Sequence, residues 1–176
     1  MRNAIYLLGL SLGLWAASAA QGGGLPRFEE YPVKAVFHGA PAKPVLSTQL
    51  ARRFRTQIRE AAAKGPNFAG SYRVAAWGCG TGCLEIAVID ERDGTLHSGP
   101  FQDLDVGGTF RYADGTKWDD EKFEPLSYRL GSRLFVARGC PDNGEQKNCA
   151  LYYYEWTGSQ FRLIVKKPAI GAPPAQ

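Results

Sequence analysis

The segment SYRVAAWGCGTGCLEIAVID, residues 71–90, decides the fold expected for this chain. Two apolar runs, Ser71–Trp77 and Leu84–Asp90, flank a glycine-rich loop that carries Cys79 and Cys83. Short apolar runs separated by turn residues are typical of antiparallel strands. Glycine adopts positive φ without steric cost, so the loop predicts a tight reversal. The segment therefore predicts a β-hairpin with one cysteine on each side of its turn.

A second segment repeats this arrangement. SYRVAAWGC (71–79) aligns without gaps to SRLFVARGC (132–140), and each is followed by a loop, a second cysteine (Cys83, Cys149), an extended run, a glycine-containing turn and another extended run. The matched Ser, Ala and Gly-Cys positions favour an internal duplication over chance similarity. Each copy would form a three-stranded meander, and two meanders could pack as a sandwich or form one curved sheet. The same pattern predicts strands at 132–138, 150–156 and 160–165, turns at 91–94 and 157–159, and a long loop between 101 and 125.

The four cysteines are expected to form two disulfides, since the chain has the features of an exported protein described below. Four cysteines allow three pairings. The duplication favours Cys79–Cys83 and Cys140–Cys149, because the cysteines of each unit flank the loop of a hairpin. Facing positions there have Cα atoms near the roughly 5.5–6 Å that a disulfide favours.

A redox or metal site at Cys79 and Cys83 is the alternative. Thioredoxin-type chemistry uses two intervening residues at the start of a helix, whereas three residues separate these cysteines between predicted strands. A soft metal would also need histidine or methionine ligands. Beyond residue 20 the chain offers only His38 and His97 and no methionine. The pattern favours a stapled turn.

The first twenty residues, MRNAIYLLGLSLGLWAASAA, have the features of a secretory signal peptide. One basic residue, Arg2, precedes an apolar run from Ile5 to Trp15, and Ala17-Ser18-Ala19 is a typical cleavage pattern. The apolar run is shorter than the roughly 20 residues of a membrane span. The sequence therefore predicts a periplasmic or secreted protein, with no membrane span after cleavage.

The remaining chain fits one domain with a sizeable core. Removing Arg2 from the 21 Lys and Arg residues leaves 20, against 17 Asp and Glu, a net charge of +3 that does not indicate nucleic acid as a partner. The expected organisation is a signal peptide at 1–20, an irregular arm at 21–46, a globular domain at 47–167 and a disordered tail at 168–176.

The segment STQLARRFRTQIREAAAKG (47–65) predicts one amphipathic helix. Ser47 or Thr48 can cap its start, and Leu50, Phe54 and Ile58 recur at helical spacing before Gly65 and Pro66 end the pattern. The predicted class is therefore α+β, with a helix packed on mostly antiparallel sheet.

Two features of this domain are candidate binding residues. Arg52, Arg53, Arg55 and Arg59 form either a solvated charged face or an anion-binding face of the helix. In YYYEW (152–156), Tyr152, Tyr154 and Trp156 share one strand face and Tyr153 lies on the other. Tyr153 is a candidate contact residue if its face is exposed. The partner expected from the arginines is an anionic envelope polymer or an acidic protein surface.

The segment FQDLDVGGTFRYAD (101–114) partly matches an EF-type calcium loop. With Asp103 at position one, Asp105 falls at three, Gly108 at six and Asp114 at twelve. Position five is Gly107, where an oxygen ligand belongs. The pattern therefore predicts either a low-affinity calcium site or a solvated acidic turn.

Three segments together resemble a family of short exported bacterial proteins with an NFAG-x-Y…WGCG-x-x-C core. They are GPNFAGSYRVAAWGCGTGCLEIAVID, SYRLGSRLFVARGCP and CALYYYEW. The resemblance implies export and a disulfide-stapled fold, and supplies no catalytic residues. Gly70-Ser71-Tyr72 is also similar to a loop of periplasmic lysozyme inhibitors.

No hydrolase, metalloprotease or nucleotide-binding motif occurs in the sequence. The expected function is an exported, non-catalytic binding protein, such as an inhibitor or an envelope-binding module. The competing expectation is a hydrolase or a metal or redox protein that uses the Cys79/Cys83 loop with His38 or His97.

Overall fold

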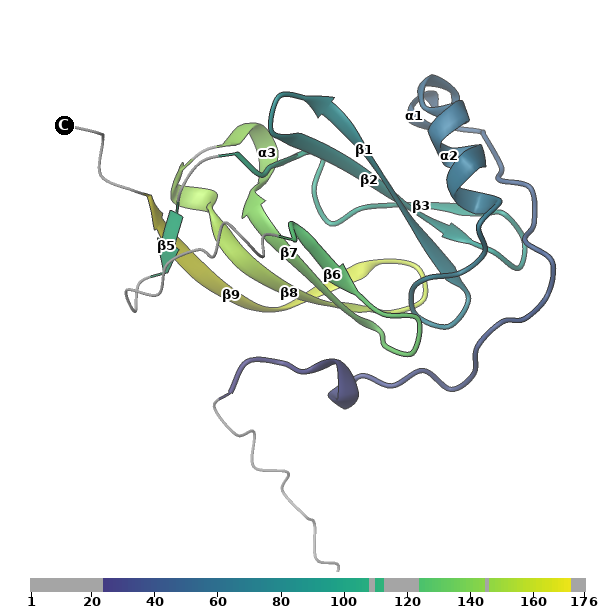
Figure 1. Cartoon of the computed structure of the whole chain (residues 1–176), viewed down its shortest axis with the longest axis horizontal. Coiled ribbons are helices and arrows are strands. Elements are labelled where there is room, and N and C mark those ends of the chain that lie inside the picture. The colour runs from purple at the N-terminus through teal and green to yellow at the C-terminus, as the bar shows by residue number, and fades with distance from the viewer. Residues whose placement is uncertain (1–23, 108–109, 113–123, 145, 172–176) are drawn as a thin grey trace, which may run out of the picture.

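The computed structural model describes residues 24–107, 110–112, 124–144 and 146–171; the predicted signal peptide lies outside them. Figure 1 shows two long hairpins that cross at an angle, with two helices beside the first. The elements are the short 3-10 helices η1 (Phe28–Glu30) and η3 (Gln146–Asn148), the helices α1 (Gln49–Arg53), α2 (Arg55–Ala62) and α3 (Pro141–Gly144), and the strands β1 (Tyr72–Gly80), β2 (Cys83–Asp90), β3 (Leu96–Ser98), β4 (Leu104–Asp105), β5 (Phe110–Tyr112), β6 (Leu126–Tyr128), β7 (Leu134–Cys140), β8 (Ala150–Trp156) and β9 (Phe161–Gly171). The fold is α+β and mostly antiparallel, as predicted.

The first hairpin is longer than expected, because its strands continue through the cysteines. β1 and β2 pair from Tyr72↔Asp90 to Gly78↔Leu84, and a bulge follows before Gly80↔Cys83. Only Thr81 and Gly82 then remain to turn the chain. Gly82 has a φ of 68°, a left-handed conformation that favours glycine.

The second hairpin has the same register relative to its cysteines. In the first unit Gly78 pairs with Leu84, the residue after Cys83. In the second unit Gly139 pairs with Ala150, the residue after Cys149. Each hairpin also gains a third strand, β3 beside β2 and β9 beside β8. The two units therefore match in register and strand order, as a duplication would predict.

The short strand β4 joins the two meanders into one curved sheet with the order β1-β2-β4-β7-β8-β9-β5. Asp105 is the connecting residue, since its backbone pairs with Cys83 on one side and with Cys140 on the other. Leu104 pairs with Leu84 and also bridges Pro141. The long loop predicted between 101 and 125 therefore contains strand residues that hold the disulfide-bearing ends of both hairpins together.

Both hairpins contribute to the main core. Val74, Ile86 and Val88 of the first unit meet Phe135, Ala137, Tyr152, Tyr154 and Trp156 of the second, together with Phe68, Tyr72, Phe101, Leu104 and Ala150. Tyr152, Tyr154 and Trp156 lie on the same side, so the predicted alternation of YYYEW is confirmed.

At the ends of the hairpins away from the disulfides, a hydrogen-bond network connects the two units. Arg92 donates from Nε to Asp90 Oδ1 at 2.9 Å and from a terminal nitrogen to the Tyr72 hydroxyl at 3.1 Å. The Tyr72 hydroxyl in turn donates to the Gly158 carbonyl, in the β8–β9 turn, at 2.9 Å. Burial raises the pKa of Asp90, but the hydrogen bonds and charge of Arg92 outweigh it and leave the pKa below its ordinary value. This network joins the turns of the two units.

The single predicted helix is two helices in the structure. The Thr48 hydroxyl accepts from Ala51 N at 3.0 Å and caps α1. Phe54, with φ −103° and ψ 25°, breaks the helical path between α1 and α2. Its ring packs toward the sheet, where Ala51, Ile58 and Ala62 are also buried. The break between α1 and α2 thus lies at a residue that packs against the sheet, and helical periodicity alone does not reveal this break.

The N-terminal arm lies along the domain (Figure 1). Its backbone donates at Val33 to Gly131, at Phe37 to Gly70 and at Ala42 to Glu91. At the other end, β9 continues to Gly171 and so extends into the predicted tail. No helix within the described ranges is long and apolar enough to cross a membrane.

Candidate functional site

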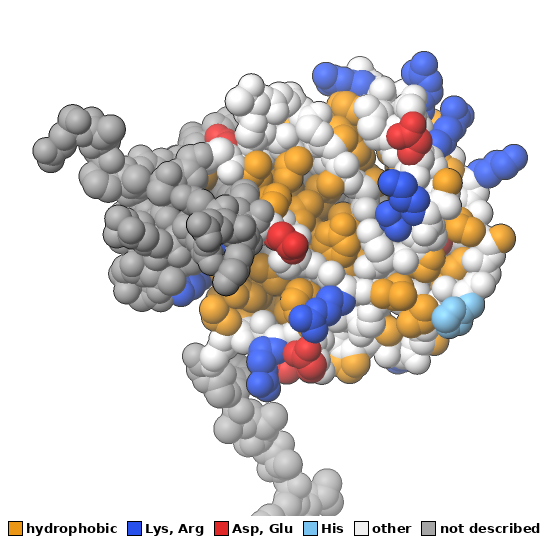
Figure 2. Space-filling model, viewed as in Figure 1, with side chains coloured by type: hydrophobic (Ala, Val, Ile, Leu, Met, Phe, Trp, Pro, Cys, Tyr) orange, Lys and Arg blue, Asp and Glu red, His pale blue; other side chains and the backbone are white. Residues whose placement is uncertain are grey.

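The two helices present four arginines on the side away from the core. Ala51, Ile58 and Ala62 face the sheet, and the arginines between them are exposed. We call this set, Arg52, Arg53, Arg55 and Arg59, the arginine surface. Glu60 is the one acidic residue of the two helices. Figure 2 shows Lys and Arg side chains gathered over α1 and α2, with an acidic side chain among them.

The contacts of the arginine surface leave its charge unneutralised. Arg52 donates to the Ser47 carbonyl at 2.5 Å, and Arg55 donates to the Arg52 carbonyl at 3.3 Å. The Arg53 guanidinium lies 5.0 Å from the centre of the Phe54 ring. In the part of the chain that the structure describes, none of the four forms an ion pair with a carboxylate.

Two arginines outside the helices behave differently. Arg133 and Arg162 both donate hydrogen bonds to the Glu155 carboxylate. Burial raises the pKa of Glu155, but the hydrogen bonds and charges of these two arginines lower it by more, so the pKa lies below its ordinary value. Glu155 therefore neutralises much of the charge of Arg133 and Arg162, whereas no carboxylate within the described ranges does so for the four arginines of the helices.

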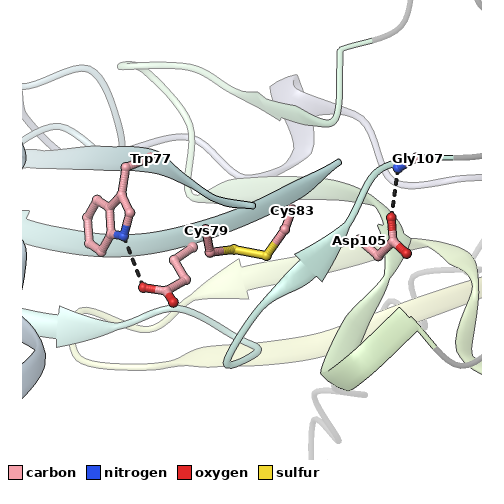
Figure 3. The surroundings of a disulfide bond; sticks show 6 residues. Trp77, Cys79, Cys83, Asp105 and Gly107 are labelled. Carbon is pink, nitrogen blue, oxygen red and sulfur yellow. Dashed lines mark hydrogen bonds between the residues drawn. A yellow bond between two sulfur atoms is a disulfide. The ribbon is translucent and has the colours of Figure 1, made fainter. Parts of the chain in front are cut away.

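An aromatic stack ties the arginine surface to the stapled hairpin. The Phe54 ring lies 4.8 Å from the Trp77 ring, at an interplanar angle of 30°. Trp77 belongs to β1, and its Nε1 donates to Glu85 Oε2 on β2 at 3.0 Å (Figure 3). Arg53, Phe54 and Trp77 thus form a continuous layer from the surface to the sheet. This layer fixes the position of the helices relative to β1.

Both predicted disulfides are present, and all four cysteines are in them. Cys79–Cys83 joins neighbouring strands with Cα atoms 5.2 Å apart, and Cys140–Cys149 closes the second loop at 3.9 Å. Cys79 is exposed, whereas Cys140 and Cys149 are buried. The Cys79/Cys83 loop is therefore a stapled turn between strands.

The acidic loop is only partly described. Asp105 Oδ1 accepts from Gly107 N at 2.8 Å, next to the Cys79–Cys83 disulfide (Figure 3). Asp103 lines a neighbouring cleft, and Asp114 lies outside the described residues. No group of three or more His, Cys, Asp or Glu residues among those described could hold a metal ion. Calcium binding by Asp103, Asp105 and Asp114 stays a prediction.

A cleft of about 820 Å³ lies between the start of α1 and the β3–β4 connection. Its ionisable side chains are Glu85, His97, Asp103 and Asp142. Glu85 accepts from Trp77 Nε1, and Asp142 accepts from Gln102 N at 3.3 Å. The His97 ring packs against Tyr72 and Trp156, at 6.2 and 5.3 Å between ring centres. His38 is not among the lining residues, so the cleft does not bring the two histidines together.

Tyr153 is buried and is therefore not an exposed contact residue. Only 8% of its surface is accessible. It packs with Leu134 and Leu151, and Phe28 and Tyr31 of the N-terminal arm cover this cluster. Sequence alternation correctly placed Tyr153 on the second face of β8. The arm that buries this face is distant in sequence, which is why the burial was missed.

Glu91 is a buried carboxyl group that sequence analysis missed, because ERDG reads as a solvated turn. Its exposed fraction is 0%, and neither carboxylate oxygen has a hydrogen-bond partner among the described residues. Burial raises the pKa of Glu91 to about 7, against a lowering influence of Arg73 and a raising influence of Asp90. Its carbonyl accepts from Ala42 of the N-terminal arm at 2.9 Å, so this group lies where the arm meets the domain.

Glu91 is expected to make the protein less stable at neutral pH than at pH 5. The folded pKa is raised, so the folded state binds the proton more tightly than the unfolded state. Its stabilising contribution is complete below the unfolded value near 4.5 and is lost as the pH rises through about 7. Between pH 5 and pH 8 the wild type should lose about 2–3 kcal/mol more than Glu91→Gln. Urea denaturation of both proteins across this range is the test, and parallel pH profiles would contradict it.

No family model, curated protein or solved structure matches the chain. The resemblance to the family with the NFAG-x-Y…WGCG-x-x-C core therefore stays a prediction.

Proposed function

We propose that the protein is an exported, non-catalytic binding protein that holds an anionic partner on its arginine surface. The observation that supports this proposal most strongly is the set of four exposed guanidinium groups without a carboxylate partner in the described structure. Guanidinium groups form paired hydrogen bonds with carboxylates and phosphates. An anionic polymer or an acidic protein surface would supply the charge that this part of the domain lacks.

The scaffold beneath the arginine surface supports the same proposal. The helices pack on β1 through the Phe54–Trp77 stack, and a disulfide joins β1 to β2. A surface that is already ordered loses little conformational entropy when a partner binds. The two disulfides are also suited to an oxidising compartment outside the cytoplasm. Such a protein can act by presenting a charged surface, without a catalytic residue.

Charge reversal at Arg52 and Arg55 is expected to weaken capture of a carboxylate polymer. Polygalacturonate and a glutamate-rich peptide are suitable probes. Each exposed ion pair contributes about 0.2–1 kcal/mol, and Arg52→Glu/Arg55→Glu replaces two attractions with repulsions. The dissociation constant should therefore rise roughly tenfold or more, which corresponds to about 1.4 kcal/mol per decade.

The control is Lys34→Glu/Lys166→Glu, which changes the net charge equally at two exposed positions outside the helices. This variant should retain nearly wild-type affinity. Circular dichroism should show folded protein in both cases, since exposed substitutions usually alter stability by less than about 0.5 kcal/mol. Equal affinity of the wild type and a folded Arg52→Glu/Arg55→Glu protein would exclude the arginine surface as the binding site.

A further inference from the structure

The strand beside the arginine surface has an edge that is only half covered. β1 is a terminal strand of the sheet and has β2 as its one neighbour in the strand order. Near its start, Tyr72 N donates to the Phe68 carbonyl at 2.9 Å. Further along, the Asn67 side chain accepts from Val74 N at 2.8 Å and donates to the Val74 carbonyl at 3.4 Å. The preceding loop thus occupies the outer edge as far as Val74.

Beyond Val74 the outer edge is bare. The direction of backbone N–H and C=O groups alternates along a strand. Since Val74 directs its groups away from β2, Ala76 and Gly78 direct theirs the same way. Within the described ranges, no backbone or side-chain group hydrogen-bonds to them on that side. These four polar groups offer a ladder for an additional strand.

Among the described residues, this part of the edge is open to solvent. Ala76 and Gly78 are both exposed and have minimal side chains. Proteins usually protect an open edge with a charged residue, a proline or a bulge, and here the bulge begins only after Gly78. The open edge therefore has a defined end at the Cys79–Cys83 disulfide.

The arginine surface indicates what kind of strand could bind. Trp77 lies between Ala76 and Gly78, and its ring stacks on the Phe54 ring. The Arg53 guanidinium lies over the Phe54 ring. An added strand would run next to the helices that carry four unneutralised arginines. A second copy of this chain would bring two such surfaces together and is disfavoured by like-charge repulsion. An acidic strand is complementary in charge.

We propose that the anionic partner is an acidic polypeptide segment, which adds to the outer edge of β1 as an extended strand. Backbone hydrogen bonds to Ala76 and Gly78 would hold the segment in register. Its alternate side chains would be acidic and point to the side of the sheet on which the arginine-bearing helices pack, and the others would lie beside Ala76. This inference rests on the proposed function and names the partner class of the same surface.

The probe is a peptide of about eight residues, a usual strand length, that alternates glutamate with valine. A second peptide has the same side chains but methylated nitrogens at every internal residue, so that neither backbone edge can donate. We expect the wild-type protein to bind the methylated peptide at least roughly tenfold more weakly. Equal binding of the two peptides overturns the inference, whatever the behaviour of any protein variant.

The protein-side test replaces Ala76 by proline, which removes the outward N–H. β1 does not use this group to pair with β2, and proline is tolerated at edge positions of this kind. Ala76→Pro should lower the affinity for the peptide roughly tenfold. Ala76→Ser keeps the N–H group and should bind the peptide like the wild type. Circular dichroism checks that both are folded.

The outcomes distinguish this inference from the proposed function. If Arg52→Glu/Arg55→Glu loses affinity while Ala76→Pro and the methylated peptide do not, the arginine surface binds anions but strand addition is wrong.

Tighter binding of polygalacturonate than of the peptide would assign the surface to a polysaccharide and also overturn the inference. Self-association of the wild type that Ala76→Pro abolishes would identify a second copy as the occupant instead. Equal affinity of the arginine double variant would overturn both proposals.

Discussion

Replacement of Trp156 by alanine is expected to lower the free energy of unfolding by about 3–5 kcal/mol, as for other fully buried large aromatic residues. Only 1% of the Trp156 surface is accessible. Its ring contacts Tyr72 and His97 of the first unit at 5.1 and 5.3 Å between centres, and Phe161 of the second at 4.8 Å. The substitution would therefore leave a cavity where the two hairpins meet.

The measurement is urea denaturation of Trp156→Ala beside Leu163→Ala. Leu163 is 50% exposed on the neighbouring strand, and its truncation should cost about 0.5 kcal/mol or less. A Trp156→Ala protein whose stability matches that of Leu163→Ala would contradict a shared core between the two units.

Removal of the Cys140–Cys149 disulfide is expected to cost a little under about 3 kcal/mol, and removal of Cys79–Cys83 about 2 kcal/mol. The difference follows from ring size, because the sequence separations are nine and four residues and a larger ring restricts the unfolded chain more. Both sulfurs of the larger ring are also buried, so the alanine variant loses packing there.

The test compares Cys140→Ala/Cys149→Ala and Cys79→Ala/Cys83→Ala with the wild type by denaturant unfolding. The ranking is the result that matters. A greater loss from the smaller ring would show that the Cys79–Cys83 staple supports more of the fold than its own hairpin.

Much of the sheet could be predicted because its signals are local. Apolar runs separated by glycine turns identified the hairpins, and the matched segments identified the two disulfides. The alternation of YYYEW grouped Tyr152, Tyr154 and Trp156 on one strand face because the side-chain period of a strand is two. Each of these inferences uses residues that are close in sequence.

The features that were missed depend on partners distant in sequence. β4 is only two residues long and exists because Asp105 meets Cys83 and Cys140. The N-terminal arm buries Tyr153, and its backbone contacts the turn that contains Glu91. No local pattern reveals such contacts. The sequence likewise marked the arginines as a candidate surface without showing that β1 has an open edge beside them.

The most direct test of the proposed binding surface is the affinity of the alternating glutamate–valine peptide at increasing salt. Electrostatic screening strengthens as the Debye length falls from about 30 Å at 0.01 M to about 8 Å at 0.15 M ionic strength. The wild type and Lys34→Glu/Lys166→Glu should both lose affinity over this range, and Arg52→Glu/Arg55→Glu should bind weakly throughout with a much flatter dependence. An affinity that neither salt nor reversal of Arg52 and Arg55 changes would contradict the account.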